Sequence, residues 1–144
     1  MATRSKIAIE NQDGTVSSIY CHWDGYPSHH GPILFGHYTT QEKVESLIKL
    51  GSISSLAPEP QIPEGVNHNF ENPSEGIVVA YHRDRGEALS IDSHASVNDF
   101  IKSDVEEYGY IFTAAGEWLF ANGHVGAYDR EAVLLENVLV KEAE

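Results

Sequence analysis

The chain has 144 residues, of which 41% are apolar, 22 are acidic and nine are basic, so its formal net charge at pH 7 is −13. These values predict one folded domain over residues 1–144 with a core of its own. No apolar run approaches the ~18 residues of a membrane span, and the basic start of the chain does not continue as a secretory signal. The single cysteine excludes an internal disulfide and favours a cytoplasmic, reducing setting.

The excess of acidic over basic residues also limits which kinds of molecule the chain can bind. A protein that binds nucleic acid directly needs positive charge to displace counterions from the phosphates, so we expect no direct nucleic-acid binding. A charge of −13 favours solubility, cationic partners or mimicry of a nucleic acid. An acidic inhibitor that mimics DNA therefore stays open as one function, although the chain has no long acidic run.

Hydrophobic periodicity and turn residues predict alternating hairpins and helices. Two stretches stand out. Residues 76–81 form a continuous apolar, β-branched run typical of a central strand. Residues 57–75 carry four of the six prolines and predict a long loop, which is either functional or mobile. The expected elements are strands at 6–10 and 15–23, helices at 31–38 and 39–51, a strand at 76–81, an extended piece at 88–92, a helix at 96–109, a hairpin at 110–113 and 117–120, and a helix or strand at 132–140.

This order predicts an α+β fold, with a mainly antiparallel sheet built from hairpins and two or three packed helices. The tail at 132–140 fits a strand by its valines and leucines and a helix by its Glu, Ala and Leu content, and we favour the helix.

The first candidate site lies at the end of the second expected strand, where aromatic, acidic and histidine side chains crowd into residues 20–30. Trp23 and Tyr26 could stack on a flat or apolar group, while His22 and Asp24 supply hydrogen bonds. The alternative is structural: Tyr20 and Trp23 belong to the core, Asp24 and Gly25 form a turn, and the histidines are solvated.

The same stretch contains groups for two kinds of catalysis. His22, Asp24, His29 and His30 are weak candidates for metal ligands, because their spacing matches no established metal motif. Cys21 could act as a nucleophile beside a histidine, but strand alternation turns it toward the core. The sequence predicts no catalytic residue and no cofactor.

The second candidate site is the stretch 81–87, which contains two of the nine basic residues, Arg83 and Arg85. If the preceding strand continues, both arginines lie on one face and could bind a phosphate or a carboxylate. The alternative is local ion pairing with Asp84 and Glu87. We expect the two candidate sites to lie side by side and form one binding site, covered by the 57–75 loop.

One set of stretches carries a resemblance to known proteins: residues 3–10, 13–16, 19–26, 37–38, 44–50 and 81–87. These stretches resemble a family of small proteins that occurs widely in the genomes of tailed bacteriophages, including T-even-like phages. The resemblance covers most of the chain and is sharpest over the first fifty residues. It implies a phage origin and action in the host cytoplasm, and it carries over no catalytic residue.

Together these observations predict a small acidic accessory protein that binds a host protein or a small anionic ligand during host takeover or defence evasion. Its ligand-binding residues would be His22, Trp23, Asp24, Tyr26, Arg83 and Arg85. One alternative is a metal-assisted hydrolase of a phosphate-containing small molecule, and another is the acidic DNA mimic. The oligomeric state stays open.

Overall fold

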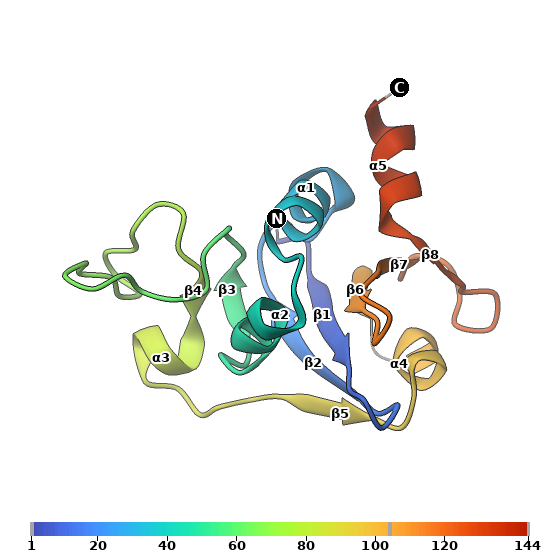
Figure 1. Ribbon diagram of the computed structural model, residues 1–144, viewed down its shortest axis with the longest axis horizontal. Helices are drawn as coiled ribbons and strands as arrows, with labels where there is room; N and C mark the ends of the chain where they lie inside the picture. The colour runs from blue at the N-terminus through green and yellow to red at the C-terminus, as the bar shows by residue number, and fades with distance from the viewer. Residues whose placement is uncertain (1, 104, 144) are drawn as a thin grey trace.

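An eight-stranded mixed sheet runs through the molecule, and helices lie on both of its faces (Figure 1). The computed structural model describes residues 2–103 and 105–143. In the described residues the elements are β1 (Ser5–Glu10), β2 (Val16–Cys21), α1 (Pro27–His37), α2 (Gln41–Ile48), β3 (Ile53–Ser55), β4 (Val79–Ala80), α3 (Tyr81–Arg85), β5 (Asp92–His94), α4 (Val97–Ser103), β6 (Tyr108–Phe112), β7 (Trp118–Asn122), β8 (Ala132–Leu134) and α5 (Leu135–Ala143).

The strand order is β4-β3-β2-β1-β6-β7-β8, and β5 pairs with β2 outside this path. The α+β class is confirmed, but the expectation of a mainly antiparallel sheet of hairpins is only partly right. Strand β1 pairs with β6 in parallel, and β2 pairs with β3 in parallel. The reason is that α1 and α2 carry the chain from the end of β2 back to the start of β3, which is a crossover and not a hairpin.

Both predicted hairpins are present. Strands β1 and β2 pair from Ser5 opposite Cys21 to Glu10 opposite Val16, and β6 and β7 also pair antiparallel. In the first turn Gly14 has a φ of +87°, a conformation that costs a residue without a Cβ very little. Turn chemistry therefore determined the register of the sequence-local pairs.

The expectation of a central strand at 76–81 is wrong. Only Val79 and Ala80 are extended, and β4 lies at the edge of the sheet. Ile77 and Val78 are nevertheless buried. Val78 belongs to the larger part of the core, and Ile77 makes an isolated bridge with Glu59, so this apolar run is buried without being a central strand.

The helices differ from expectation mainly at their ends. Helix α1 begins at Pro27, four residues before the expected start at residue 31, because a proline suits the first turn of a helix, where its missing amide hydrogen costs no bond. Thr40 caps α2 by accepting a hydrogen bond from the Lys43 amide at 3.2 Å, so this helix begins after Thr40. The tail contains both predicted alternatives, since β8 leads directly into α5.

The core has two parts, one on each face of the sheet. The larger part packs α1, α2 and α5 against one face, with Ile7, Ile19 and Tyr110 at its centre. The smaller part packs α4 against the other face around Ala8 and Phe100. No helix among the described residues is long and apolar enough to cross a membrane.

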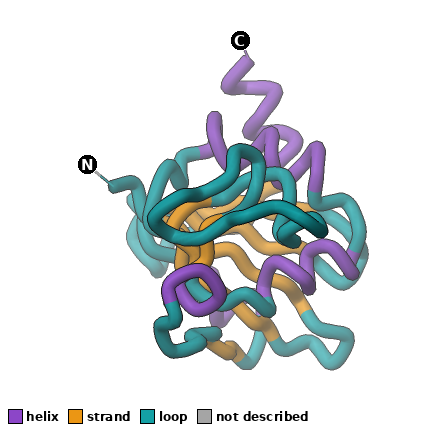
Figure 2. The backbone as a smooth tube through the Cα atoms, turned by 90° about the vertical axis from the view of Figure 1, so that its left-hand side faces the viewer, coloured by secondary structure: helices purple, strands orange, loops and turns teal. Residues whose placement is uncertain are grey.

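The predicted 57–75 loop contains no helix or strand, and it projects beside α3 and β4 (Figures 1 and 2). Its two ends are paired: the Glu59 amide donates to the Gly76 carbonyl at 3.1 Å, and the Val78 amide donates to the Glu59 carbonyl at 2.9 Å. The loop is thus closed at its base by backbone hydrogen bonds.

Candidate functional site

The chain leaves β2 into a short exposed segment that contains the first candidate site. Trp23 is 44% exposed, so the alternative that placed it in the core does not apply, and Tyr26 is 38% exposed. The His22 ring meets the Trp23 ring edge to face, with 4.7 Å between centroids. We call the side chains of Tyr20, His22, Trp23, Asp24 and Tyr26 the Trp23 surface.

The backbone of the Trp23 surface is held against its neighbours. The His22 and Trp23 amides donate to the Ile53 and Ser54 carbonyls at 3.1 and 3.0 Å, which extends the pairing with β3 beyond the end of β2. The chain then turns sharply, with Asp24 in the left-handed region at a φ of +57°. Exposed aromatic side chains on a fixed backbone lose little conformational entropy on binding.

Gly25 lets this turn pass close to β1. Its amide donates to the Thr3 carbonyl at 2.9 Å, and its carbonyl accepts from the Tyr110 hydroxyl at 2.7 Å. A Cβ at position 25 would lie 2.6 Å from the Cβ of Ser5. Only glycine fits this approach, and the close contact fixes where Trp23 and Tyr26 emerge.

Tyr20 also belongs to this surface, although the structural alternative placed it in the core; it is only partly buried. Its hydroxyl lies 2.7 Å from Nδ1 of His22, as the period-2 alternation of a strand allows. Burial raises the pKa of the Tyr20 hydroxyl; Glu106 and Tyr81 add to the shift, and Arg4 opposes it. Tyr20 therefore stays protonated and can fix the orientation of the His22 ring.

The four metal candidates do not gather at one point. His22 contacts Tyr20, whereas His29 and His30 lie on α1 with their Nδ1 atoms 3.0 Å apart. Asp24 faces the Tyr26 hydroxyl at 3.5 Å. Within residues 2–103 and 105–143, no group of three or more His, Cys, Asp or Glu residues is placed to hold a metal ion.

Two groups of this stretch are buried in the core. Burial raises the pKa of the Cys21 thiol to about 12, so the thiolate that nucleophilic attack needs does not form near neutral pH. His30 is fully buried against Tyr110, and burial, followed by the neighbouring His29, lowers its pKa to about 3. Cys21 and His30 act as neutral core residues.

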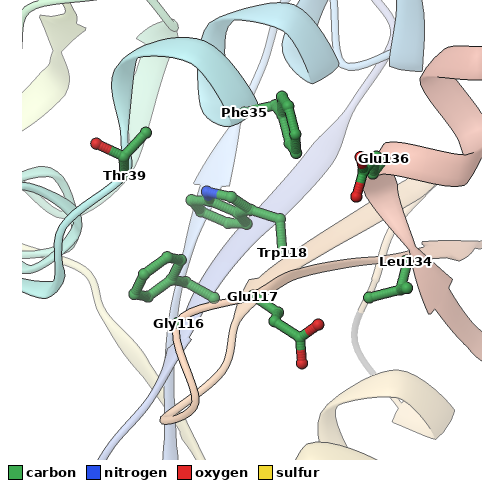
Figure 3. A pocket seen from close by; sticks show the side chains of 8 residues that line it. Phe35, Thr39, Gly116, Glu117, Trp118, Leu134 and Glu136 are labelled. Carbon is green, nitrogen blue, oxygen red and sulfur yellow. The ribbon is translucent and has the colours of Figure 1, made fainter.

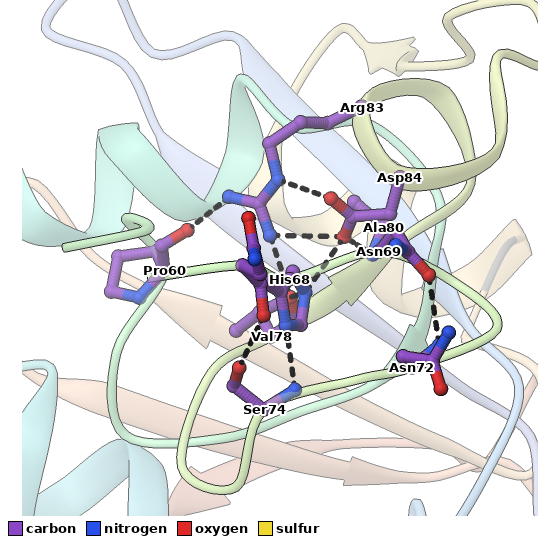
Figure 4. Close-up of polar contacts among 10 residues, drawn as sticks. Pro60, His68, Asn69, Asn72, Ser74, Val78, Ala80, Arg83 and Asp84 are labelled. Carbon is purple, nitrogen blue, oxygen red and sulfur yellow. Dashed lines mark hydrogen bonds and ion pairs between the residues drawn. The ribbon is translucent and has the colours of Figure 1, made fainter. Parts of the chain in front are cut away.

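The second candidate site contains a hydrogen-bond network around Asp84 (Figure 4). The Asp84 carboxylate is 1% exposed and accepts from Arg83, from the Ala80 amide at 2.8 Å and from His68 at 3.2 Å. Arg83 also donates to the Pro60 and Val78 carbonyls. We call Arg83, Asp84 and His68 the Asp84 network.

Protonation in this network follows from its hydrogen bonds. Burial alone would raise the pKa of Asp84, but hydrogen bonds from Arg83 and the Ala80 amide outweigh it and lower that pKa. The Ser74 amide donates to Nδ1 of His68 at 2.9 Å, so the proton of the neutral ring lies on Nε2, where it faces Asp84. The network therefore ties the 57–75 loop to α3.

Arg85 is the more accessible of the two arginines. It is paired with Glu87, and its side chain is 50% exposed. The guanidinium also lies over the rings of Phe70 and Tyr81, at 4.4 and 5.2 Å from their centroids. Residues 81–85 form α3, so the condition under which strand alternation would place both arginines on one face is not met. The two arginines consequently have separate partners and do not form one anion site.

The two candidate sites lie on either side of β3. Trp23 donates to the carbonyl of Ser54, and Tyr81 donates to the carbonyl of Ser52 at 3.2 Å. One intervening strand implies about 10 Å between the two backbones. The structure thus brings the two segments near each other, but the guanidinium of Arg83 is directed into the Asp84 network.

No family model, curated protein or solved structure matches this chain. Of the two candidate sites, the Trp23 surface has exposed aromatic side chains, whereas Arg83 and Asp84 are bonded to each other and to the chain.

Proposed function

We propose that this chain is a small acidic binding protein, an accessory protein of a tailed phage, and that the Trp23 surface contacts a host protein. The observation that carries the proposal is the exposure of Trp23 and Tyr26 on a backbone paired with β3 and β1. Tryptophan and tyrosine dominate the binding energy of many protein interfaces because they bury a large area with few rotatable bonds. The sequence resemblance to phage proteins supports the host context.

The charges favour a protein over a small anion as the ligand. Arg83 is engaged by Asp84 and by two carbonyls, and Arg85 is paired with Glu87. An anion would have to displace Glu87 and approach a chain with a net charge of −13. A protein with a basic surface is instead attracted by the negative charge of the chain, and this long-range attraction speeds association.

The test is capture of bacterial proteins on the immobilised chain, followed by calorimetry with the purified captured protein. Trp23→Ala should weaken binding by about tenfold or more, as truncation of a central aromatic residue does. Tyr128→Ala is the matched control, because Tyr128 is an aromatic residue that is 94% exposed in a different loop. Equal binding of the Trp23→Ala variant and the unaltered chain would contradict the proposal.

A further inference from the structure

A groove of about 370 Å³ lies at the other end of α1, between that helix and the corner formed by β7, β8 and α5 (Figure 3). Trp23 precedes the first turn of α1, whereas Phe35 lies in its last turn. Eleven helical residues span about 16 Å, so the groove is separate from the Trp23 surface.

The floor and one wall of the groove are apolar and fixed. Trp118 is 6% exposed, and its indole nitrogen donates to the Tyr38 carbonyl at 2.9 Å. Phe35 lies above Trp118, and Leu134 is on the opposite side. Phe35 is 45% exposed, so its ring is accessible from the groove.

The rim of the groove is acidic. Glu117 and Glu136 are exposed and line it, and within the part of the chain that the structure describes no Lys, Arg or His residue does. Among the described residues, neither carboxylate has an ion-pair partner within the chain. The groove therefore combines an aromatic floor with two unpaired negative charges.

We propose that this groove binds an arginine or lysine side chain in a basic segment of another protein. Such a side chain has an apolar stem and a cationic head. The stem would lie on Trp118, Phe35 and Leu134, while the head would be held by Glu117 and Glu136 and attracted by the aromatic faces. A second copy of the chain is a poor occupant because it carries the same −13 charge, and phosphates would be repelled by the same carboxylates.

The test adds unlabelled peptides to the nitrogen-15-labelled chain. One peptide is acetyl-Gly-Ser-Arg-Leu-Arg-Ser-Gly-amide, and the other has citrulline in place of both arginines. The chain has two tryptophans, so a nitrogen-15 spectrum contains two indole N–H signals, which Trp23→Phe assigns. The arginine peptide should shift the Trp118 signal saturably and leave the Trp23 signal in place. The citrulline peptide, which has the same shape without the charge, should leave both in place.

Variants then separate this groove from general charge attraction. Glu117→Gln with Glu136→Gln should weaken binding of the arginine peptide by about tenfold, since two charge pairs at ~0.7 kcal/mol each give that factor. Glu64→Gln with Glu71→Gln changes the net charge equally, at exposed positions in the 57–75 loop, and should leave the affinity unchanged.

Three results would overturn the proposal: an unmoved Trp118 signal, equal binding of the citrulline peptide, or equal weakening in both double variants. None of these results bears on Trp23, so failure here is distinct from failure of the proposed host-protein surface.

Discussion

The Trp23 surface and the Asp84 network come from sequence stretches of similar composition, yet the structure gives them opposite roles. Both stretches combine histidine, acidic and aromatic residues next to a strand. At the first, Trp23 and Tyr26 extend into solvent. At the second, Arg83 and Asp84 make their hydrogen bonds to the chain itself. Composition identifies side chains that could bind a ligand or take part in catalysis. Only their hydrogen-bond partners show which of them are available to a ligand.

The largest expected effect concerns the Asp84 network. Asp84→Ala removes the acceptor shared by Arg83, His68 and the Ala80 amide. The Ala80 amide then has no partner and the Arg83 charge has no counterion in the network, although Arg83 and His68 keep the Val78 carbonyl. We expect the free energy of unfolding to fall by about 3 kcal/mol, as when one partner of a buried pair is removed. Urea unfolding measures the loss, and hydrogen exchange should show faster exchange of the Ser74 amide. An unchanged exchange rate there would show that the loop does not depend on Asp84.

The next largest effect is a dependence of the free energy of unfolding on pH, which we expect from His30 in the first stretch. The ordinary pKa of 6.5 applies in the unfolded chain, whereas burial lowers it to about 3 in the folded chain. Between pH 6.5 and pH 3 only the unfolded state binds this proton. The contribution of His30 to the free energy of unfolding is therefore fully present above pH 6.5 and decreases as the pH falls toward 3. This one group should cost about 2 kcal/mol between pH 7 and pH 5.

The pH effect can be isolated by two substitutions on α1. His30→Gln should reduce the slope of stability against pH in this window, while His37→Gln, at an exposed position, should leave the slope unchanged. Asp84 does not interfere, because its pKa is lowered from 3.8 and its contribution is lost only as the pH falls below that value. A slope that is identical in His30→Gln and the unaltered chain would contradict the assignment.

A smaller effect tests the turn that supports the Trp23 surface. Gly25→Ala places a Cβ 2.6 Å from Ser5 and 2.9 Å from the Thr3 carbonyl, so the backbone must shift. We expect a loss of about 1–2 kcal/mol in the free energy of unfolding. Gly36→Ala in α1 is the control, since nothing lies within 4 Å of a Cβ there, and it should stabilise the helix by about 0.5–1 kcal/mol. Equal stability of both variants would argue against the close approach.

The smallest effect is expected at Arg85. Its pair with Glu87 is half exposed on both sides, and such pairs contribute about 0–1 kcal/mol. Arg85→Ala should therefore change the urea midpoint far less than Asp84→Ala. A loss as large as that of Asp84→Ala would move Arg85 into the Asp84 network and contradict the distinction between the two arginines.

The sequence predicted those parts of the fold that depend on neighbouring residues. The β1–β2 hairpin follows from Gly14 and the flanking β-branched residues, and Gly51, at a φ of +74°, follows α2 as expected. The parallel pairing of β1 with β6 was beyond reach, because it joins residues about a hundred positions apart with no local signature. The edge position of β4 was missed for a related reason: residues buried at the edge of a sheet and residues buried between two strands have the same apolar pattern.

The candidate sites were predictable to a similar extent. Residue type selected the stretch around Trp23, whose aromatic side chains are exposed, and the period-2 geometry of a strand accounts for the contact between Tyr20 and His22. No local pattern indicated that His68 and Pro60 would satisfy Arg83 and Asp84 from the distant part of a proline-rich loop. The groove at Phe35 was missed because its lining comes from three separate segments, and Trp118 alone resembles an ordinary core residue.

The most direct test of the contrast between the two regions is the urea unfolding of Arg83→Met beside that of Trp23→Ala. Arg83 donates to Asp84 and to two carbonyls, so Arg83→Met should lower the free energy of unfolding by about 2–3 kcal/mol. Trp23 is 44% exposed, so Trp23→Ala should stay within about 0.5 kcal/mol of the unaltered chain. Equal losses, or a larger loss for Trp23→Ala, would contradict the account, because Trp23 would then serve the fold and Arg83 would be available to a ligand.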